Sequence, residues 1–448
     1  MTTDLAAADV AGAGSRGRFI QISLAALAFL LGLGMIYATG RDNADFTDNV
    51  DYVAAARMLI ENGTYPDVGT LQFFRAPLYP LLMASVWAAV GESVFAVKIV
   101  QCLLHAVGAI IAFRAGLLIG GNTLVATLAG IGYAANPFFL FHGAAIQTEA
   151  LHTFLVTLAL FLAFRMAIAE DGLRLPWAIA CGLAFGLAAL CKNSALGVCI
   201  VVSVAMLALC YRRPNALAAS GLIVLSAFAA ILPWSFYNLK TRGEFILIND
   251  AGGYALWLGN HPANLRIYEG SFASREEAYR YYDHLGKTLA SEQVAEWESG
   301  TGYSRLSYGE REALWRGKAV ENAVADPATT AKLWWWKFLY LWRPWLSPEI
   351  YSMKAALLSA AWQVPLFIFG FAGAVFTAFR RNLWPAAAVF FVVLVFVTVT
   401  HTVVVSNMRL RMPYIDPWLT VFAAVAIVEV ATRHLGRATE TLRRLLEN

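Results

Sequence analysis

Charged side chains are scarce in this sequence. Asp, Glu, Lys and Arg make up 14% of its 448 residues, whereas hydrophobic residues make up 59%. Soluble domains have roughly 25% charged residues, so the composition excludes an ordinary soluble protein. The net charge of +4 is small and the basic residues are dispersed, which excludes nucleic acid as a partner. The composition instead predicts an all-α polytopic membrane protein.

The sequence also lacks the usual signatures of cofactor sites. Its five cysteines lie in apolar segments without metal-ligand spacing, which indicates packing residues. There is no HxxxH motif or Cys/His set for a structural metal, and no Gly-rich loop for a soluble nucleotide sugar. We therefore expect no cofactor. The remaining alternative is a divalent cation held by Asp48 and Glu149, which no ligand pattern supports.

Apolar runs separated by basic turns predict ten membrane spans with both termini in the cytoplasm. A span needs about 20 apolar residues, and Lys and Arg gather at its cytoplasmic end. The turns at 212–213 and 380–381 and both termini follow this rule. The predicted spans are Phe19–Ala38, Val94–Leu118, Leu124–Phe141, Ala150–Ala169, Pro176–Leu190, Ser194–Tyr211, Ala216–Trp234, Ala355–Phe379, Leu383–Val403 and Pro413–Val430.

One further apolar run, Pro77–Val90, has only about 14 residues, which favours an interfacial or re-entrant helix over a span. Counting it as a span would invert the topology of everything after it. The predicted order is then a cytoplasmic tail (1–18), a transmembrane core (19–234) whose first external loop is 39–93, an external segment (235–350), C-terminal transmembrane helices (351–431) and a cytoplasmic tail (432–448).

The external segment is expected to be mainly helical. Ser274–Glu298 and Ser307–Ala325 have amphipathic patterns, and Ser307 with Glu310 forms a capping-box pattern. Asp326 followed by Pro327 predicts the start of a third helix. That helix continues as AKLWWWKFLYLWRPW, a mixture of aromatic and basic residues typical of a membrane interface.

Several charged residues lie on the predicted external side although they come from distant parts of the chain. Basic residues there run against the topology rule, so they are candidates for binding an anion. A lipid phosphate is the anion that approaches from a bilayer. The alternatives are that these cations have only structural partners and that Asp48 only caps a helix. The candidate phosphate ligands are Arg75, Lys192, Arg409 and Arg411.

Several stretches together resemble the GT-C superfamily of membrane glycosyltransferases. They are, in the first loop, DNVDYVAAARMLIENG and FFRAPLYPLL, and later NPFFLFHGAAIQTEALHTFL, LCKNS, LPWSFYNLKTRGEF, GGYALWLGNHP and RLRMPYIDP. The resemblance covers nearly the whole chain and is closest to the protein O-mannosyltransferase and lipid A aminoarabinose transferase group. It implies a GT-C-like bundle of about ten transmembrane helices, with juxtamembrane helices in the first external loop.

The resemblance also implies roles for individual residues. Asp48 takes the position of the family's first-loop catalytic aspartate, and Glu149 that of the acidic residue in the second external loop. The chain departs from the family at Asn49, where Glu often stands, and at Ala76, where the aminoarabinose transferase has Lys beside the position of Arg75. Substrate-pocket candidates are Tyr52, Tyr79, His142, Asn260 and His261.

The residue inventory fits transfer of a sugar from a lipid phosphate. Phosphate is a good leaving group, so the reaction needs cations on the departing phosphate and one base for the acceptor hydroxyl. A glycoside hydrolase would need a coordinated pair of carboxylates. We therefore predict an inverting glycosyltransferase, with a polyprenyl-phosphate-linked sugar as donor and a hydroxyl of a lipid, glycan or protein as acceptor.

The predicted enzyme is a multi-pass protein of the bacterial cytoplasmic membrane that works among membrane lipids at the external face. Two alternatives come from other classes. A lipid-linked sugar flippase or other transporter would place ionisable residues near the membrane midplane and often shows repeated halves, which this sequence lacks. An inactive scaffold subunit of a cell-envelope glycan pathway is the other alternative.

The topology predicts which positions an external reagent reaches. Single cysteines at positions 68 and 270 should react with a membrane-impermeant maleimide in intact cells, because both positions are predicted to be external. Cysteines at positions 172 and 440 should react only after permeabilisation. Labelling of position 172 in intact cells would mean that Pro77–Val90 spans the membrane.

Overall fold

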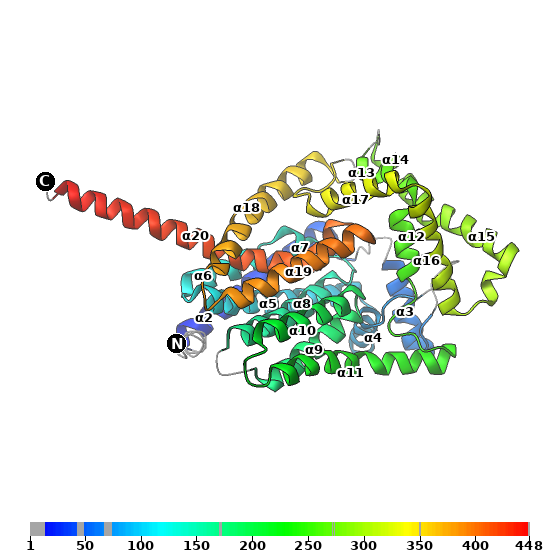
Figure 1. Cartoon of the computed structure of the whole chain (residues 1–448), viewed down its shortest axis with the longest axis horizontal. Coiled ribbons are helices and arrows are strands. Elements are labelled where there is room, and N and C mark those ends of the chain that lie inside the picture. Colours follow the sequence, from blue (N-terminus) through cyan, green and yellow to red (C-terminus); the bar gives the residue numbers. More distant parts are fainter. Residues whose placement is uncertain are drawn as a thin grey trace.

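The chain folds into a helical bundle (Figure 1). The computed structural model describes residues 14–42, 49–66, 74–169, 173–270, 272, 274–348 and 351–446. These residues form helices and no β-strand, which confirms the predicted all-α class.

Seven helices are long and apolar enough to cross a membrane, and an eighth candidate is a bent pair. The multi-pass membrane class is therefore confirmed. The seven are α2 (Ser15–Thr39), α5 (Val94–Gly120), α8 (Glu149–Ile168), α11 (Ala216–Arg242), α18 (Met353–Ala378), α19 (Trp384–Val403) and the Met408–Arg433 part of α20 (Met408–Leu446).

The bent pair replaces the single span predicted over Leu124–Phe141. It consists of α6 (Thr123–Ala134) and α7 (Pro137–Gly143), which meet at 44°. Pro137 cannot continue the hydrogen bonding of α6, and Asn136 caps the new helix by accepting from the backbone N–H of Phe138 at 3.0 Å. The Asn-Pro pair therefore ends one helix and starts the next.

Two other predicted spans are short helices. They are α9 (Leu175–Ala189) and α10 (Ser194–Cys210), with 15 and 17 residues. At 1.5 Å per residue they measure about 22 and 26 Å, less than the roughly 30 Å of a bilayer core. By length the bundle thus has fewer full spans than the ten predicted. Because α9 and α10 are consecutive, counting both or neither leaves the orientation of later helices unchanged.

The first predicted loop contains two helices. α3 (Asn49–Asn62) ends where Gly63 adopts a φ of 66°, a left-handed conformation that favours glycine. α4 (Leu78–Val90) has 13 residues and packs against α3 and α5. It measures about 20 Å, which is too short for a full span.

Two helices extend beyond the predicted ends of their membrane spans. α11 continues past Trp234 to Arg242 and ends at Gly243, which has a φ of 77°. Trp234 is the predicted end of the membrane span and not of the helix, and the helix itself ends at a left-handed glycine. α20 likewise continues to Leu446 through the predicted tail 432–448.

The segment between α11 and α18 is helical. The capping box of Ser307 and Glu310 is present, and Asp326 accepts from the backbone N–H of Thr329 at 3.0 Å, so both predicted helix starts are confirmed. Its helices are α12 (Gly252–Asn260), η1 (Pro262–Asn264), α13 (Leu265–Glu269), α14 (Arg275–Asp283), η2 (His284–Leu289), α15 (Ala290–Thr301), η3 (Tyr303–Arg305), α16 (Tyr308–Ala325) and α17 (Pro327–Trp342).

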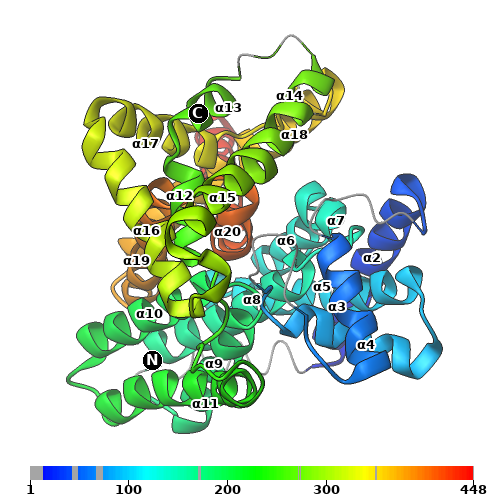
Figure 2. The ribbon, with the colours of Figure 1, turned by 90° about the vertical axis from the view of Figure 1, so that its right-hand side faces the viewer.

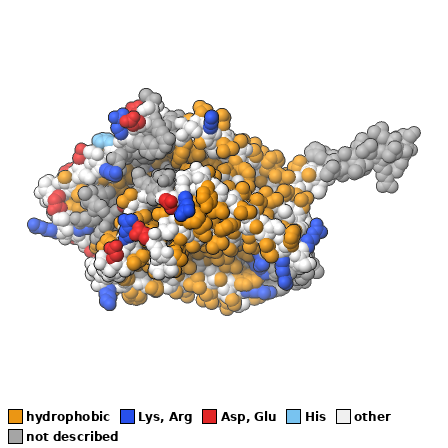
Figure 3. Space-filling model, turned by 180° about the vertical axis from the view of Figure 1, so that it is seen from behind, with side chains coloured by type: hydrophobic (Ala, Val, Ile, Leu, Met, Phe, Trp, Pro, Cys, Tyr) orange, Lys and Arg blue, Asp and Glu red, His pale blue; other side chains and the backbone are white. Residues whose placement is uncertain are grey.

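The two ends of the bundle differ in chemistry. α12–α16 lie at one end, whereas the start of α2 and the C-terminal part of α20 lie at the other (Figure 1). Figure 3 shows hydrophobic side chains over the middle of one face, basic side chains near the α20 end, and both acidic and basic side chains over the opposite end. This is the pattern of a membrane protein with a basic end.

α8 and α20 are the central helices of the bundle. In each, 72% of the span is buried, compared with 28–50% in the other long spans. α8 contacts α5 on one side and α9 and α20 on the other (Figure 2). Small residues allow such packing: a Cβ on Gly373 of α18 would lie 1.8 Å from the carbonyl oxygen of Phe422 in α20. The first residues of the two central helices carry the charges described next.

Candidate active site

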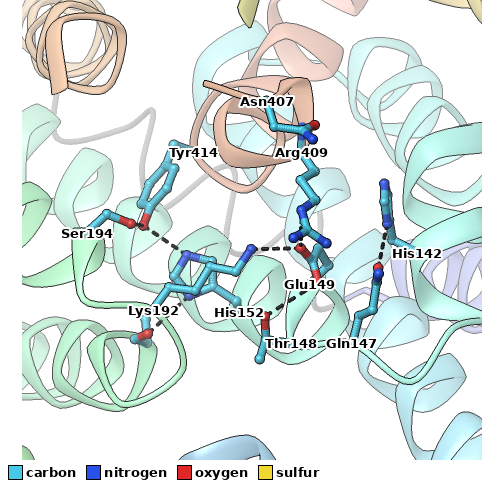
Figure 4. A network of polar contacts seen from close by, with 11 residues as sticks. His142, Gln147, Thr148, Glu149, His152, Lys192, Ser194, Asn407, Arg409 and Tyr414 are labelled. Atoms are coloured by element: carbon cyan, nitrogen blue, oxygen red, sulfur yellow. Dashed lines mark hydrogen bonds and ion pairs between the residues drawn. The ribbon is translucent and has the colours of Figure 1, made fainter. Parts of the chain in front are cut away.

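A buried carboxylate stands at the first residue of α8. Only 2% of Glu149 is exposed, and its Oε1 lies 2.7 Å from Nζ of Lys192 and 3.7 Å from Nε of Arg409 (Figure 4). A carboxylate buried among apolar helices is costly unless positive groups and hydrogen bonds compensate it. The three predicted residues, which come from distant parts of the sequence, therefore meet in one ion cluster.

Local structure brings each cation to the carboxylate. Lys192 stands in the short turn between α9 and α10, where its backbone N–H bonds to the carbonyl oxygen of Ala188 at 2.9 Å. Arg409 is in the first turn of α20, and Asn407 accepts from its backbone N–H at 3.1 Å. The cluster thus lies where α8, α10 and α20 begin and α9 ends. The partial positive charge of helix starts favours an anion there.

A second hydrogen-bonded chain supports this arrangement and was missing from the predicted site. Nδ1 of His152 lies 3.1 Å from the carbonyl oxygen of Ala188, and Nε2 lies 2.9 Å from the hydroxyl of Tyr414. Ser194 contacts the same hydroxyl at 2.8 Å (Figure 4). A carbonyl oxygen only accepts, so Nδ1 of His152 donates to Ala188. In a neutral imidazole ring Nε2 then accepts from the hydroxyl of Tyr414, and that hydroxyl accepts from the hydroxyl of Ser194.

This chain fixes the turn that carries Lys192. His152 binds the same carbonyl of Ala188 that starts the turn, and Tyr414 brings α20 to the start of α10. The sequence spacing indicates that His152 lies near Glu149, because His152 follows it by three residues and so shares its helix face. Nothing in the sequence indicated its partner on α20.

The first loop contributes a second ion pair. Nη2 of Arg75 lies 2.8 Å from Oδ2 of Asp51, and the guanidinium lies 6.0 Å from the ring centroid of Tyr52. The rings of Tyr52 and Tyr79 pack edge to face at 5.3 Å. The predicted base, Asp48, lies outside the described residues.

Two predicted pocket residues, Tyr79 and His142, belong to hydrogen bonds near the cluster. The hydroxyl of Tyr79 donates to Oε1 of Gln101 at 2.6 Å, and Gln101 donates to the backbone carbonyls of Gly143 and Ala145. His142 lies 2.9 Å from Gln147 through Nδ1. A small cavity beside Glu149 is lined by His105, Tyr133, Phe139, His142, Gly143, Glu149, Ala150, Thr153 and Met412.

Arg411 has different neighbours from Arg409. It is buried, and its guanidinium binds Asp416 at 3.1 and 3.2 Å and the carbonyl oxygen of Leu341 at 2.9 Å. A separation of two residues turns a helix by about 200°, so the two arginines point to different sides of α20. The structure therefore brings Arg409, and not Arg411, into contact with Glu149.

Asn260 and His261 lie at the end of α12. Asn260 donates to the carbonyl oxygens of Leu256 and Val403 at 2.8 and 2.9 Å. His261 accepts from the backbone N–H of Ala263 at 3.3 Å and packs on Trp257, and burial lowers its pKa. The contacts of both residues are structural ones within the segment and with the end of α19.

Within the described ranges, no group of three or more His, Cys, Asp or Glu side chains is placed to hold a metal ion. The described ion cluster combines two cations with one carboxylate. Such a site suits an anionic group rather than a cation.

One protein-family model matches part of the chain. The model of the dolichyl-phosphate-mannose-protein mannosyltransferase family matches residues 74–235, less than half of the chain. That range includes α4 to α10 and holds Glu149 and Lys192. No curated protein matches the chain significantly.

Two solved structures are similar to the chain at low identity. ArnT from Cupriavidus metallidurans bound to undecaprenyl phosphate is 15% identical, with a TM-score of 0.42, over 93% of this chain and 78% of that one. The apo form of the same protein is 14% identical, with a TM-score of 0.43, over 92% and 78%.

The ion cluster predicts a stability effect that can be measured without any substrate. Lys192→Met should lower the free energy of unfolding by about 3 kcal/mol, because Glu149 then stays buried with only the more distant Arg409. Glu149→Gln in the same chain should offset part of this loss, since the two residues are coupled. Denaturant unfolding in one fixed detergent would measure both effects.

The matched control is Lys332→Met. Lys332 binds Glu269 at 2.9 Å but is 56% exposed, so its removal should cost no more than about 1 kcal/mol. Equal losses in the two lysine variants, or additive losses in the double variant, would contradict a coupled buried pair.

Proposed function

We propose that this chain is a GT-C-type membrane glycosyltransferase that transfers a sugar from a polyprenyl-phosphate donor to a hydroxyl acceptor. The family match over residues 74–235 supports this class of enzyme. The observation that carries the proposal is the convergence of Lys192 and Arg409 on one carboxylate at the end of the bundle. The name of the matching family, which contains a lipid-phosphate-linked mannose, supports this class of donor.

The cluster has the charge that a departing phosphate requires. Lys192 and Arg409 carry two positive charges and Glu149 one negative charge, so these three residues leave a surplus of one positive charge. The starts of α8, α10 and α20 add partial positive charge. Charge that develops on the leaving phosphate is stabilised by such fixed cations, which need little reorganisation during the reaction.

The reaction is a single displacement. The acceptor oxygen attacks the anomeric carbon and forms the new glycosidic bond, while the bond from that carbon to the phosphate oxygen breaks. The bonding electrons leave with the phosphate, and the acceptor proton passes to a carboxylate base. Attack opposite to the leaving group inverts the anomeric carbon.

We assign the two acidic residues to different roles. Glu149 is buried and bound by two cations, so it is suited to hold Lys192 and Arg409 in place rather than to accept a proton. Asp48, which precedes α3 in the first loop, is the proposed base. This division agrees with a reaction that needs one base and several cations.

Arg75 is proposed as an additional phosphate ligand. Its partner Asp51 is 20% exposed and Arg75 itself 31%, so the pair is accessible enough to exchange partners when an anion arrives. Arg411 is left out of the proposed phosphate site, because it is buried against Asp416.

The proposed orientation follows from the charges at the two ends. The basic end with α2 and the tail of α20 is cytoplasmic, and the end with α12–α16 is external. The Glu149 cluster then faces outside with the first loop 39–93 and the segment 235–350. The acceptor is a hydroxyl of a lipid, glycan or protein on that side.

The first functional prediction concerns the donor. In a sugar-transfer assay on purified protein with a panel of polyprenyl-phosphate sugars, Lys192→Ala and Arg409→Ala should each raise the donor KM by about 10- to 150-fold. This range corresponds to the loss of a hydrogen bond to a charged group, worth about 1.5–3 kcal/mol. The acceptor KM should change much less.

Arg57→Ala is the matched control for these variants. Arg57 of α3 binds Glu92 at 2.6 Å on the exposed surface, so its removal should leave the donor KM unchanged. An unchanged donor KM in both cluster variants would place the phosphate elsewhere. Movement of the donor across vesicle membranes without any transfer would favour a flippase.

The second functional prediction concerns the base. Asp48→Asn keeps helix-capping ability, since Asn caps a helix about as well as Asp. Folding and donor binding should survive, while turnover should fall by roughly 10²–10⁴-fold, as is typical for the loss of a general base. Asp42→Asn in the same loop is the control, because Asp42 is 77% exposed and should not affect turnover. A fully active Asp48→Asn protein would exclude Asp48 as the base.

A further inference from the structure

A buried lysine in the segment 235–350 joins the end of α12, in the same segment, to the end of α19. Lys337 of α17 is fully buried. Its ammonium group donates to the carbonyl oxygens of Gly259 at 3.2 Å, Val403 at 2.8 Å and Val404 at 3.2 Å, and to the side-chain oxygen of Asn260 at 3.1 Å. All four acceptors are backbone or amide oxygens.

The position of these acceptors explains how a buried ammonium group is stabilised. Gly259 and Asn260 are the last residues of α12, and Val403 and Val404 stand at the end of α19. The last carbonyls of a helix have no partner within it and carry partial negative charge. Burial lowers the pKa of Lys337 to about 7. Hydrogen bonds from the ammonium group to the four oxygens favour its charged form.

The two helix ends touch at a glycine. A Cβ on Gly259 would lie 1.8 Å from the carbonyl oxygen of Val404, so only glycine permits this approach. Asn260 also bonds to Val403 and accepts from Nε1 of Trp334 at 3.0 Å. α12, α17 and α19 are therefore held together at one point.

The turn of residues 404–407 connects the contact between α12, α17 and α19 to the ion cluster. Ser406, in the turn that follows, donates to the backbone carbonyl of Lys337 at 2.7 Å. Asn407 then caps the first turn of α20, where Arg409 contacts Glu149. Only the turn of residues 404–407 separates the end of α19 from the start of α20.

We propose that Lys337 is a positioning residue: it ties α12 and α17 to the end of α19, holds the turn 404–407 and so keeps Arg409 at the ion cluster. The external segment thereby acts on the donor site without contacting the donor. The effect on the donor rests on the proposed function, whereas the effect on the turn does not.

The first test measures the turn itself. A single cysteine introduced by Val405→Cys is labelled with a charged maleimide in detergent; the native cysteines are buried. Lys337→Met and Gly259→Ala should each raise the labelling rate about tenfold, since both release the turn by different chemistry. The controls are Lys332→Met on the same helix and Gly317→Ala, where a Cβ meets nothing within 4 Å. Unchanged labelling in both test variants would overturn the proposal.

The second test measures transfer. Lys337→Met should raise the donor KM about tenfold, and should cause no further rise in an Arg409→Ala background, because both changes act through one contact. Multiplying effects would overturn the proposed route through Arg409. Raised labelling in a chain that transfers no sugar would uphold the positioning of the turn and overturn the proposed function.

Discussion

The arrangement of the helices around the site depends on cations that compensate the negative charge of the buried carboxylate of Glu149. Glu149 begins the central helix α8 and is kept from water, so its negative charge requires positive partners inside the bundle. These partners come from the turn between α9 and α10 and from the start of α20. The ion cluster thus ties three parts of the chain together at one end of the bundle. The same contacts that stabilise the carboxylate bring together the two cations of the proposed phosphate site.

The surroundings of the cluster show how its geometry is maintained. On one side, His152 and Tyr414 bind the turn that carries Lys192. On the other side, Lys337 binds the helix ends that precede Arg409. Both cations are therefore held through backbone contacts of the segments on which they stand. A site for a charged leaving group benefits from such fixed positions, because its cations need not reorganise as charge develops.

The sequence predicted the helices better than the contacts. Hydropathy located the long apolar helices but not the break between α6 and α7, and cap residues such as Ser307 and Asp326 located helix starts. Helix ends depend on local backbone geometry, so a predicted span end at Trp234 did not indicate that α11 continues to Gly243. Unusual charges on one face drew attention to Glu149, Lys192 and Arg409, but their pairing is a tertiary contact that no local pattern contains. For the same reason Arg409 and Arg411 could not be told apart, and Lys337, in an aromatic run, was interpreted only as part of a membrane interface.

The most direct test of the account is a cryo-electron microscopy structure of the protein with a bound polyprenyl phosphate. We expect phosphate oxygens within hydrogen-bond distance of the Lys192 ammonium group and the Arg409 guanidinium, with Glu149 still bound to both. A phosphate bound at another place, with the Glu149 cluster closed and out of contact, would contradict it.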